Sequence, residues 1–195
     1  MSSVGFTKFY ESLERCPIIA GVNNDELLER LGTSSCEIAY ILYGDICNIH
    51  DIVDKVISYG KIPVVHIDLV NGLASREISV DFIKKYTNAA GIISTKPHLI
   101  KRGNELDLIT IQRFFMLDRT NYHNIKRHVK ETSPDIVEVM PAGLTKMIEY
   151  VKEEIGDRTM IASGLVVEMS YVTGALSAGA IAISTTNTDI WDALD

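Results

Sequence analysis

The sequence predicts an α/β protein, a compact (β/α)8 TIM barrel formed by a single domain of residues 1–195. Short apolar runs alternate with helix-like segments eight times, and this alternation is typical of a parallel sheet with right-handed crossovers. Eight units allow the sheet to close, and 195 residues lie near the lower size limit of about 200 for such a barrel. No strand is followed by Gly-x-Gly-x-x-Gly, which disfavours the alternative of an open doubly wound sheet.

A lead-in of residues 1–15 precedes the barrel, which is expected to take up residues 16–195. The strands are expected at 16–22, 37–46, 63–73, 90–96, 106–115, 135–140, 159–165 and 179–185. The helices are expected at 23–31, 48–59, 76–86, 97–102, 118–132, 143–155, 168–177 and from 188 onward.

Several helix ends carry their own signals. Asn23, followed three residues later by Glu26, has the spacing of a capping box and predicts the start of the first helix. Ser75 and Asp118 are expected to cap the third and fifth helices, because their side chains can accept a backbone hydrogen bond there. Gly60 is expected to end the second helix.

The strand at 63–73 begins with apolar, β-branched residues and ends in polar ones, which suits a strand covered on both faces. Side chains alternate along a strand, so Val64, His66 and Asp68 share one face. The same alternation is expected to turn further residues toward the pore, namely Ile92, Ser94, Lys96, Ile136 and Glu138. Charged side chains of both signs would then lie together at one opening of the barrel. A buried charge is costly alone, but an oppositely charged neighbour offsets that cost.

In a barrel of this type, functional groups lie at the carboxyl ends of the strands. The polar residues and the glycine at those ends are Asp45, His66, Asp68, Lys96, Gln112, Arg113, Glu138, Ser163, Gly164, Ser184 and Thr185. Taken singly, each of them is better explained as part of a structural ion pair or as a solvated loop charge. As a group they predict a ligand site, because so many separate strands end in the same way.

The last two strands end in residues that suit a phosphate group. Phosphate sites of these barrels form at this position, from backbone N–H groups and the N-terminus of a short helix. Gly164 lets the backbone approach a ligand closely, and the hydroxyls of Ser184 and Thr185 add donors. The alternative is ordinary turn and cap chemistry, for which glycine and serine are widely used.

Catalysis is the rival interpretation, with a small phosphosugar aldolase or isomerase as the enzyme class. Lys96 would then form a Schiff base, or His66 and Asp68 would act as an acid–base pair. His66 and Asp68 are two residues apart on one strand, so they lie side by side rather than facing a substrate. A bound phosphate would account for Lys96 and Arg113 as simple charge partners, and no catalytic residue is assigned.

Hydrophobic residues make up 46% and charged residues 23% of the chain, as in globular proteins in water. No apolar run reaches the roughly 20 residues needed to cross a bilayer, and residues 1–15 lack the apolar core of a signal peptide. Cys16, Cys36 and Cys47 have no metal-type spacing and are expected to be reduced thiols. These features predict a cytoplasmic protein with no metal, no cofactor and no membrane partner.

The formal net charge of −7 is unevenly distributed. Residues 76–130 hold 11 Lys and Arg against 5 Asp and Glu, a balance of +6, whereas the remainder holds 8 against 21, a balance of −13. The helices predicted in this region carry Lys84, Lys85, Lys101, Arg102, Lys126, Arg127 and Lys130. On neighbouring helices these residues would form one surface for an RNA or DNA backbone. The alternative is a set of solvated helix ends that complement the helix dipoles, and the residues alone favour this alternative.

Three runs of the sequence strongly resemble the glycerol uptake operon antiterminator regulatory protein family: VHIDLVNGL at 65–73, GIISTK at 91–96 and TIQRFF at 110–115. Further matches are PDIVEVMPAG at 134–143, GLV at 164–166 and GAIAISTT at 179–186. The likeness covers nearly the whole chain, and the last two matches are shared by many phosphate-binding barrels. Ser163 stands where the family has the first glycine of a Gly-Gly pair.

The resemblance implies a (β/α)8 barrel that senses glycerol 3-phosphate as an effector and binds the leader mRNA of glycerol-utilisation genes, which prevents premature termination. The residues expected at the phosphate are Gly164, Leu165, Ser184, Thr185, Lys96 and Arg113. Those expected at the glycerol hydroxyls are His66, Asp68, Glu138 and Asp45. The basic helix residues are then the candidate RNA face, and a homodimer is left open.

Overall fold

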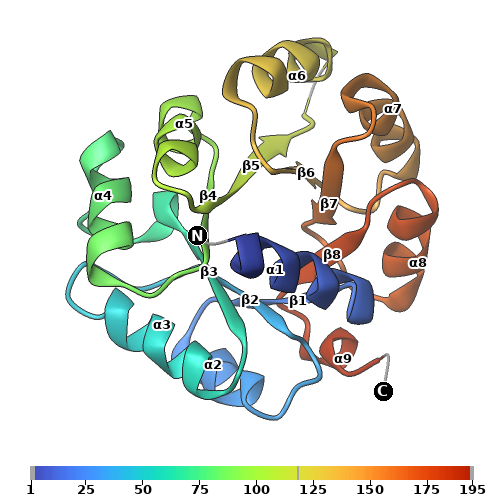
Figure 1. Ribbon diagram of the computed structural model, residues 1–195. Helices are drawn as coiled ribbons and strands as arrows, with labels where there is room; N and C mark the ends of the chain where they lie inside the picture. Colours follow the sequence, from blue (N-terminus) through green and yellow to red (C-terminus); the bar gives the residue numbers. More distant parts are fainter. Residues whose placement is uncertain (1–2, 118, 194–195) are drawn as a thin grey trace.

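The computed structural model describes residues 3–117 and 119–193 and confirms the predicted fold, a closed barrel of eight parallel strands in chain order (Figure 1). The strands are β1 Ile18–Val22, β2 Ile38–Ile41, β3 Ile62–His66, β4 Gly91–Ser94, β5 Ile109–Phe115, β6 Ile136–Met140, β7 Thr159–Ser163 and β8 Ala182–Thr185. The helices are α1 Ser3–Arg15, α2 Asp25–Leu31, α3 Ile49–Ser58, α4 Glu77–Tyr86, α5 Pro97–Glu105, α6 Arg119–Thr132, α7 Thr145–Ile155, α8 Met169–Ser177 and α9 Thr188–Trp191, with a 3-10 turn, η1 Ile67–Leu69, after β3.

Alternate side chains of the strands fill the inside of the barrel. The buried residues gathered there include Ile19, Tyr40, Val64, Ile93, Ile111, Ile136, Ile161 and Ala182. Their neighbours in the sequence, such as Val65 and Ile92, pack outward in the cluster that the helices cover. Both faces of each strand are therefore buried, as expected of a parallel barrel.

The prediction of the inward face of β4 was wrong. Ile93, and not Ile92, belongs to the interior cluster, so the alternation expected for Ile92, Ser94 and Lys96 is shifted by one residue. The sequence could not decide this, because two consecutive isoleucines suit a strand that is buried on both faces.

The strand that begins near residue 63 also ends earlier than predicted. β3 stops at His66, and the chain then makes the 3-10 turn η1, in which Ile67 is buried and Leu69 is exposed. The turn removes Asp68 from the strand alternation, so Asp68 does not share the inward face of Val64 and His66.

The lead-in forms helix α1, which closes the amino end of the barrel. Figure 1 shows α1 lying across the barrel axis. Phe9 and Leu13 are buried within the interior cluster. Arg15 donates to the Glu37 carboxylate, just before β2, at 2.8 and 2.6 Å. The hydroxyl of Tyr10 donates over 3.5 Å to the carbonyl oxygen of Asp135, just before β6.

Two caps lie one residue from their predicted positions. Asn24 rather than Asn23 is the N-cap of α2, and its side-chain oxygen accepts the N–H of Leu27 at 2.8 Å. Arg76 rather than Ser75 is the N-cap of α4, and it makes no side-chain capping bond.

The other helix-end predictions concern Gly60 and Asp118. Gly60 follows α3 with a φ of 76°, a left-handed conformation that glycine adopts without strain, and its N–H donates to the carbonyl of Ile57 at 2.8 Å. Asp118, the expected cap of α6, lies outside the described residues.

No helix within residues 3–117 and 119–193 combines the length and the apolar character needed to span a membrane. Each of the three cysteines is a free thiol, and Cys16 and Cys36 are buried whereas Cys47 is exposed.

Candidate functional site

A cavity of about 370 Å³ opens at the carboxyl end of the barrel, mainly beside β7 and β8. Its walls are formed by Gly21, Leu42, Arg113, Met140, Ser163, Gly164, Leu165, Val166, Val167, Ser184, Thr185, Thr186 and Asn187. The structure thus brings together five of the six residues expected at a phosphate: Arg113, Gly164, Leu165, Ser184 and Thr185.

Arg113 and Glu138 form a buried ion pair at the base of this cavity. They are paired positions on β5 and β6. Nε of Arg113 donates to Oε2 of Glu138 at 2.6 Å, and Nη2 donates to Oε1 at 3.2 Å. The hydroxyl of Ser184 also donates to Oε1 at 3.2 Å. The Glu138 carboxylate therefore has three donors, which offset the cost of burying its charge.

His66 lies in the same polar layer and is only 3% exposed. Burial lowers the pKa of its imidazole to about 4, and the positive charge of Arg113 acts in the same direction. The imidazole is therefore neutral at pH 7, so His66 offers hydrogen bonds and not a positive charge to a ligand.

The loop after β7 lines the cavity and holds backbone donors. Gly164 and Leu165 have φ values of 77° and 56°, and this conformation is uncommon for leucine. The carbonyls of Ser163 and Gly164 accept the N–H of Ala142 at 2.7 and 3.2 Å. Within the described chain, the N–H groups of Leu165 and Val166 donate to no other residue. Successive free N–H groups in such a turn are typical of anion sites.

The loop after β8 is held by its own polar side chains. Oγ1 of Thr185 accepts the N–H of Asn187 at 3.1 Å and donates to the carbonyl of Val166 at 3.4 Å. The Asn187 side chain caps α9 by accepting the N–H of Asp189 at 3.1 Å. The Thr185 hydroxyl and the start of the single-turn helix α9 are thus engaged within the protein, and the Ser184 hydroxyl is engaged with Glu138. The cavity-lining donors without a partner among the described residues include the Ser163 hydroxyl and the Leu165 and Val166 N–H groups.

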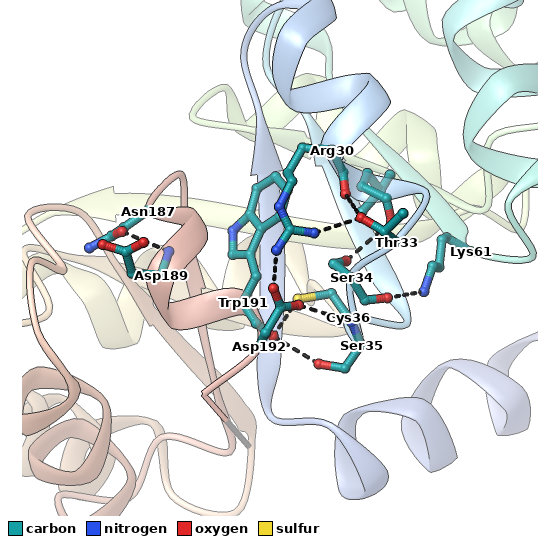
Figure 2. Close-up of polar contacts among 11 residues, drawn as sticks. Arg30, Thr33, Ser34, Ser35, Cys36, Lys61, Asn187, Asp189, Trp191 and Asp192 are labelled. Carbon is teal, nitrogen blue, oxygen red and sulfur yellow. Dashed lines mark hydrogen bonds and ion pairs between the residues drawn. The ribbon is translucent and has the colours of Figure 1, made fainter. Parts of the chain in front are cut away.

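Helix α9 anchors this loop to a distant segment. Nε1 of Trp191 donates to the carbonyl of Thr185 at 2.8 Å, and the Trp191 carbonyl accepts the hydroxyl of Ser35 at 2.9 Å. Asp192 binds the guanidinium of Arg30. Figure 2 shows Trp191 and Asp192 beside Arg30, in the last turn of α2, and Ser35, in the segment that joins α2 to β2. The loop between β8 and α9 is therefore held in place at both of its ends.

The other predicted site residues lie outside the cavity. Lys96 is exposed at the N-cap of α5. The Asp68 carboxylate accepts the hydroxyl of Ser94 at 2.8 Å and the N–H and hydroxyl of Thr95 at 2.8 and 2.9 Å. Asp45 accepts backbone N–H groups of the turn that follows it, at 2.7 and 3.2 Å. Asp68 and Asp45 are thus bound within loops, although the negative charge of Asp68 still acts on Arg113 and His66 in the direction that raises the pKa of each.

The basic residues lie on α4, α5 and α6, which stand side by side on one flank of the barrel (Figure 1). Exposed cations there are Lys84, Lys85, Lys101, Lys126, Arg127 and Lys130. Arg102 differs, because its guanidinium binds Asp81 at 2.5 Å and Glu105 at 2.7 Å. Tyr86 adds an exposed aromatic ring to this flank, with Nζ of Lys85 5.1 Å from its centroid.

Sequence reasoning missed several residues of the site. Asn187, Met140 and Leu42 line the cavity, and Tyr40 lies two residues before Leu42 on the inner face of β2. Asn187 stands in the polar run that ends the last strand, so the sequence could have identified it as a site residue. Tyr40 stands within an apolar run, so the sequence gives no sign that it lies near the site.

Comparison with known families gives a match over most of the chain. A family described as "Glycerol-3-phosphate responsive antiterminator" matches residues 18–191. An uncharacterised Escherichia coli (strain K12) protein, YgcP, is 37% identical over 179 residues, which are 92% of this chain and 93% of that protein.

Two solved structures are similar over their full barrels. A glycerol uptake operon antiterminator regulatory protein from Listeria monocytogenes has a TM-score of 0.87 and 26% identity, covering 90% of this chain and 95% of that one. A glycerol uptake operon antiterminator-related protein from Thermotoga maritima has a TM-score of 0.80 and 29% identity, covering 89% and 96%.

Proposed function

The chain belongs to the glycerol-3-phosphate responsive antiterminator family, and on this basis we propose that it binds glycerol 3-phosphate and, in response, the leader mRNA of glycerol-utilisation genes. The observation that carries the proposal is the cavity at the ends of β7 and β8. It joins a buried guanidinium, a serine hydroxyl and unpaired backbone N–H groups in one small space.

The phosphate is assigned to the mouth of this cavity. The N–H groups of Leu165 and Val166 are donors fixed by the surrounding loop, and Ser184, whose hydroxyl donates to Glu138, lines the same space. Arg113 places a guanidinium in the cavity wall, and Glu138 compensates its charge, so the backbone N–H groups at the mouth carry most of the phosphate recognition. Fixed donors of this kind lose little conformational freedom on binding, which favours affinity for a small anion.

The arrangement favours a sensor over an enzyme. Glu138 is fully buried and bound to Arg113 and Ser184, so its carboxylate is already engaged as an acceptor. His66 is neutral and buried, and Lys96 lies outside the cavity. A proton shuttle or a Schiff base at the ligand would need one of these groups to move.

The RNA is assigned to the exposed cations of α4, α5 and α6. The basic residues in the last turns of these helices, Lys84, Lys85 and Lys130, lie toward the end of the barrel opposite the cavity. Ligand and RNA would then bind at separate places, and a coupling free energy between them would raise the RNA affinity of the ligand-bound form. Phosphate contacts by lysine make such binding strongly dependent on salt.

Two measurements test the proposal. Calorimetry with glycerol 3-phosphate, glycerol and inorganic phosphate should show the tightest binding for glycerol 3-phosphate. A gel shift with leader RNA of a glycerol-utilisation gene, at several salt concentrations, should show tighter binding when glycerol 3-phosphate is present. Binding of none of the three small molecules would remove the effector assignment, and RNA binding unchanged by the ligand would remove the coupling. Sedimentation equilibrium tests the homodimer, which stays a prediction.

A further inference from the structure

Unpartnered polar atoms gather inside the barrel. Within the described residues, four buried side-chain atoms have no hydrogen-bond partner: Tyr40 Oη, His66 Nδ1, Arg102 Nε and Ser163 Oγ. Three of the four belong to strand residues, on β2, β3 and β7. A buried polar group left unpaired costs on the order of 1–3 kcal/mol, so three in one interior call for a common explanation.

These atoms surround the Arg113–Glu138 pair. Ser163 lines the cavity and is the register partner of Ser184, which donates to Glu138. Tyr40 is fully buried, and burial, reinforced by the negative charge of Glu138, raises the pKa of its hydroxyl. Arg113 lowers the same pKa and that of His66, so both side chains lie within the field of the ion pair.

The depth of Tyr40 follows from the strand geometry. Leu42, the residue that follows β2, lines the cavity, and Tyr40 lies two residues earlier, hence about 6–7 Å back along the strand direction. Tyr40 packs in the interior cluster with Val64, so its ring faces the pore. Of the unpartnered groups, Ser163 lines the cavity itself, whereas the hydroxyl of Tyr40 and the imidazole of His66 are buried below it, beside the ion pair.

The charge of this floor restricts what it can bind. The positive charge of Arg113 is compensated by Glu138, and the remaining groups are two hydroxyls and a neutral imidazole. A carboxylate placed there would face Glu138 without a free cation. Hydroxyl groups, which both donate and accept, match the unpaired atoms without adding charge.

We propose that Tyr40 and Ser163 recognise the hydroxyl groups of the ligand, so that the site selects a polyol monophosphate over an alkyl phosphate or a phosphorylated acid. This inference rests on the proposed binding of glycerol 3-phosphate at the same cavity. The phosphate stays at the mouth, against Leu165, Val166 and Ser184, and the glycerol end points to the floor.

The test compares two ligands that differ only in their hydroxyls, glycerol 3-phosphate and n-propyl phosphate, by calorimetry. The native protein should prefer glycerol 3-phosphate, and Tyr40→Phe should weaken its binding about tenfold, the value of one hydrogen bond, while changing n-propyl phosphate by less than about twofold. Ser163→Ala should act in the same way. Tyr59→Phe is the matched control, since its hydroxyl binds Glu29 on the outer surface, 2.9 Å away.

The outcomes separate the two proposals. If the native protein binds both ligands equally, or if Tyr40→Phe weakens both alike, the hydroxyls of Tyr40 and Ser163 serve buried water or packing, and the inference fails while phosphate binding stands. If the native protein binds neither ligand, both proposals fall. The urea midpoint of unliganded Tyr40→Phe should not decrease, because the hydroxyl has no partner in the protein; a clear decrease would overturn the inference.

Discussion

Arg113 and Glu138 occupy paired positions on β5 and β6, and their side chains meet in a two-point ion pair in which Glu138 has no exposed surface. Single-partner and double replacements therefore have different consequences, because a lone buried charge costs far more than a buried pair.

Glu138→Gln should lower the free energy of unfolding by about 3 kcal/mol, because it leaves the Arg113 cation buried without a countercharge. The double replacement Arg113→Met with Glu138→Leu should recover a large part of this loss. Urea denaturation of the two variants measures both values. A double variant that loses the sum of the two single effects would contradict the account of the pair.

His66 should make stability depend on pH. Its pKa is about 4 in the folded protein against 6.5 in the unfolded chain, so the unfolded chain binds more protons between these values. Stability is therefore fully present above pH 6.5 and is lost as the pH falls toward 4. The contribution between pH 7 and pH 5 is about 2 kcal/mol.

Urea denaturation at pH 7 and pH 5, for the native protein and for His66→Gln, measures this contribution. The carboxylates that also titrate in this range are present in both proteins, so the difference between their two pH dependences belongs to His66. Equal pH dependence in the two proteins would show that His66 is not held neutral by the fold.

Gly164→Ala and Gly60→Ala form a matched pair. Both glycines have positive φ, 77° and 76°, so both replacements should cost a similar amount of stability, about 1 kcal/mol. A Cβ at Gly164 would lie 2.5 Å from Cε of Met140, which can shift but lines the cavity, whereas nothing lies within 4 Å at Gly60. Calorimetry should therefore show weaker glycerol 3-phosphate binding for Gly164→Ala alone, and an equal loss in Gly60→Ala would contradict it.

Trp191→Phe should lower the free energy of unfolding by about 2 kcal/mol, because it removes the hydrogen bond to the carbonyl of Thr185 and reduces buried volume. Arg30→Gln, which removes the half-exposed pair to Asp192, should cost less than about 1 kcal/mol. Thermal unfolding followed by circular dichroism compares the two. A larger effect at Arg30 would assign the anchoring of α9 to charge instead of to the buried indole.

Lys101→Gln should weaken binding to leader RNA and reduce the slope of log affinity against log salt by about 0.7 for single-stranded RNA. Its neighbour Arg102 is bound to Asp81 and Glu105, so Arg102→Gln should leave the slope unchanged. Gel shifts at three salt concentrations measure both slopes. Equal slopes in the native protein and Lys101→Gln would place the RNA elsewhere.

The barrel and much of its cavity could be predicted from the sequence because their signals are local. Eight apolar runs separated by helical segments require a parallel sheet. Gly164 and Ser184 stand where strands end in polar residues, and Arg113 is a charged residue near the end of an apolar strand. Closure of the barrel then brings these ends together.

What could not be predicted depends on contacts between distant segments. Asp68 is captured by Ser94 and Thr95, which lie 26 and 27 residues further along the chain. The unpaired hydroxyl of Tyr40 emerges only when the strands close around it. The sequence did carry a signal for α1, since Phe9 and Leu13 are four residues apart and share a helix face.

Helix α1 also has a consequence for the kinetics of binding. Phe9 and Leu13 close the amino end of the barrel. A small molecule in the cavity must therefore enter and leave through the opening at the carboxyl end. The residence time of the effector is then set by the loops around that rim, so any macromolecule seated over it would slow both arrival and escape without touching the effector itself.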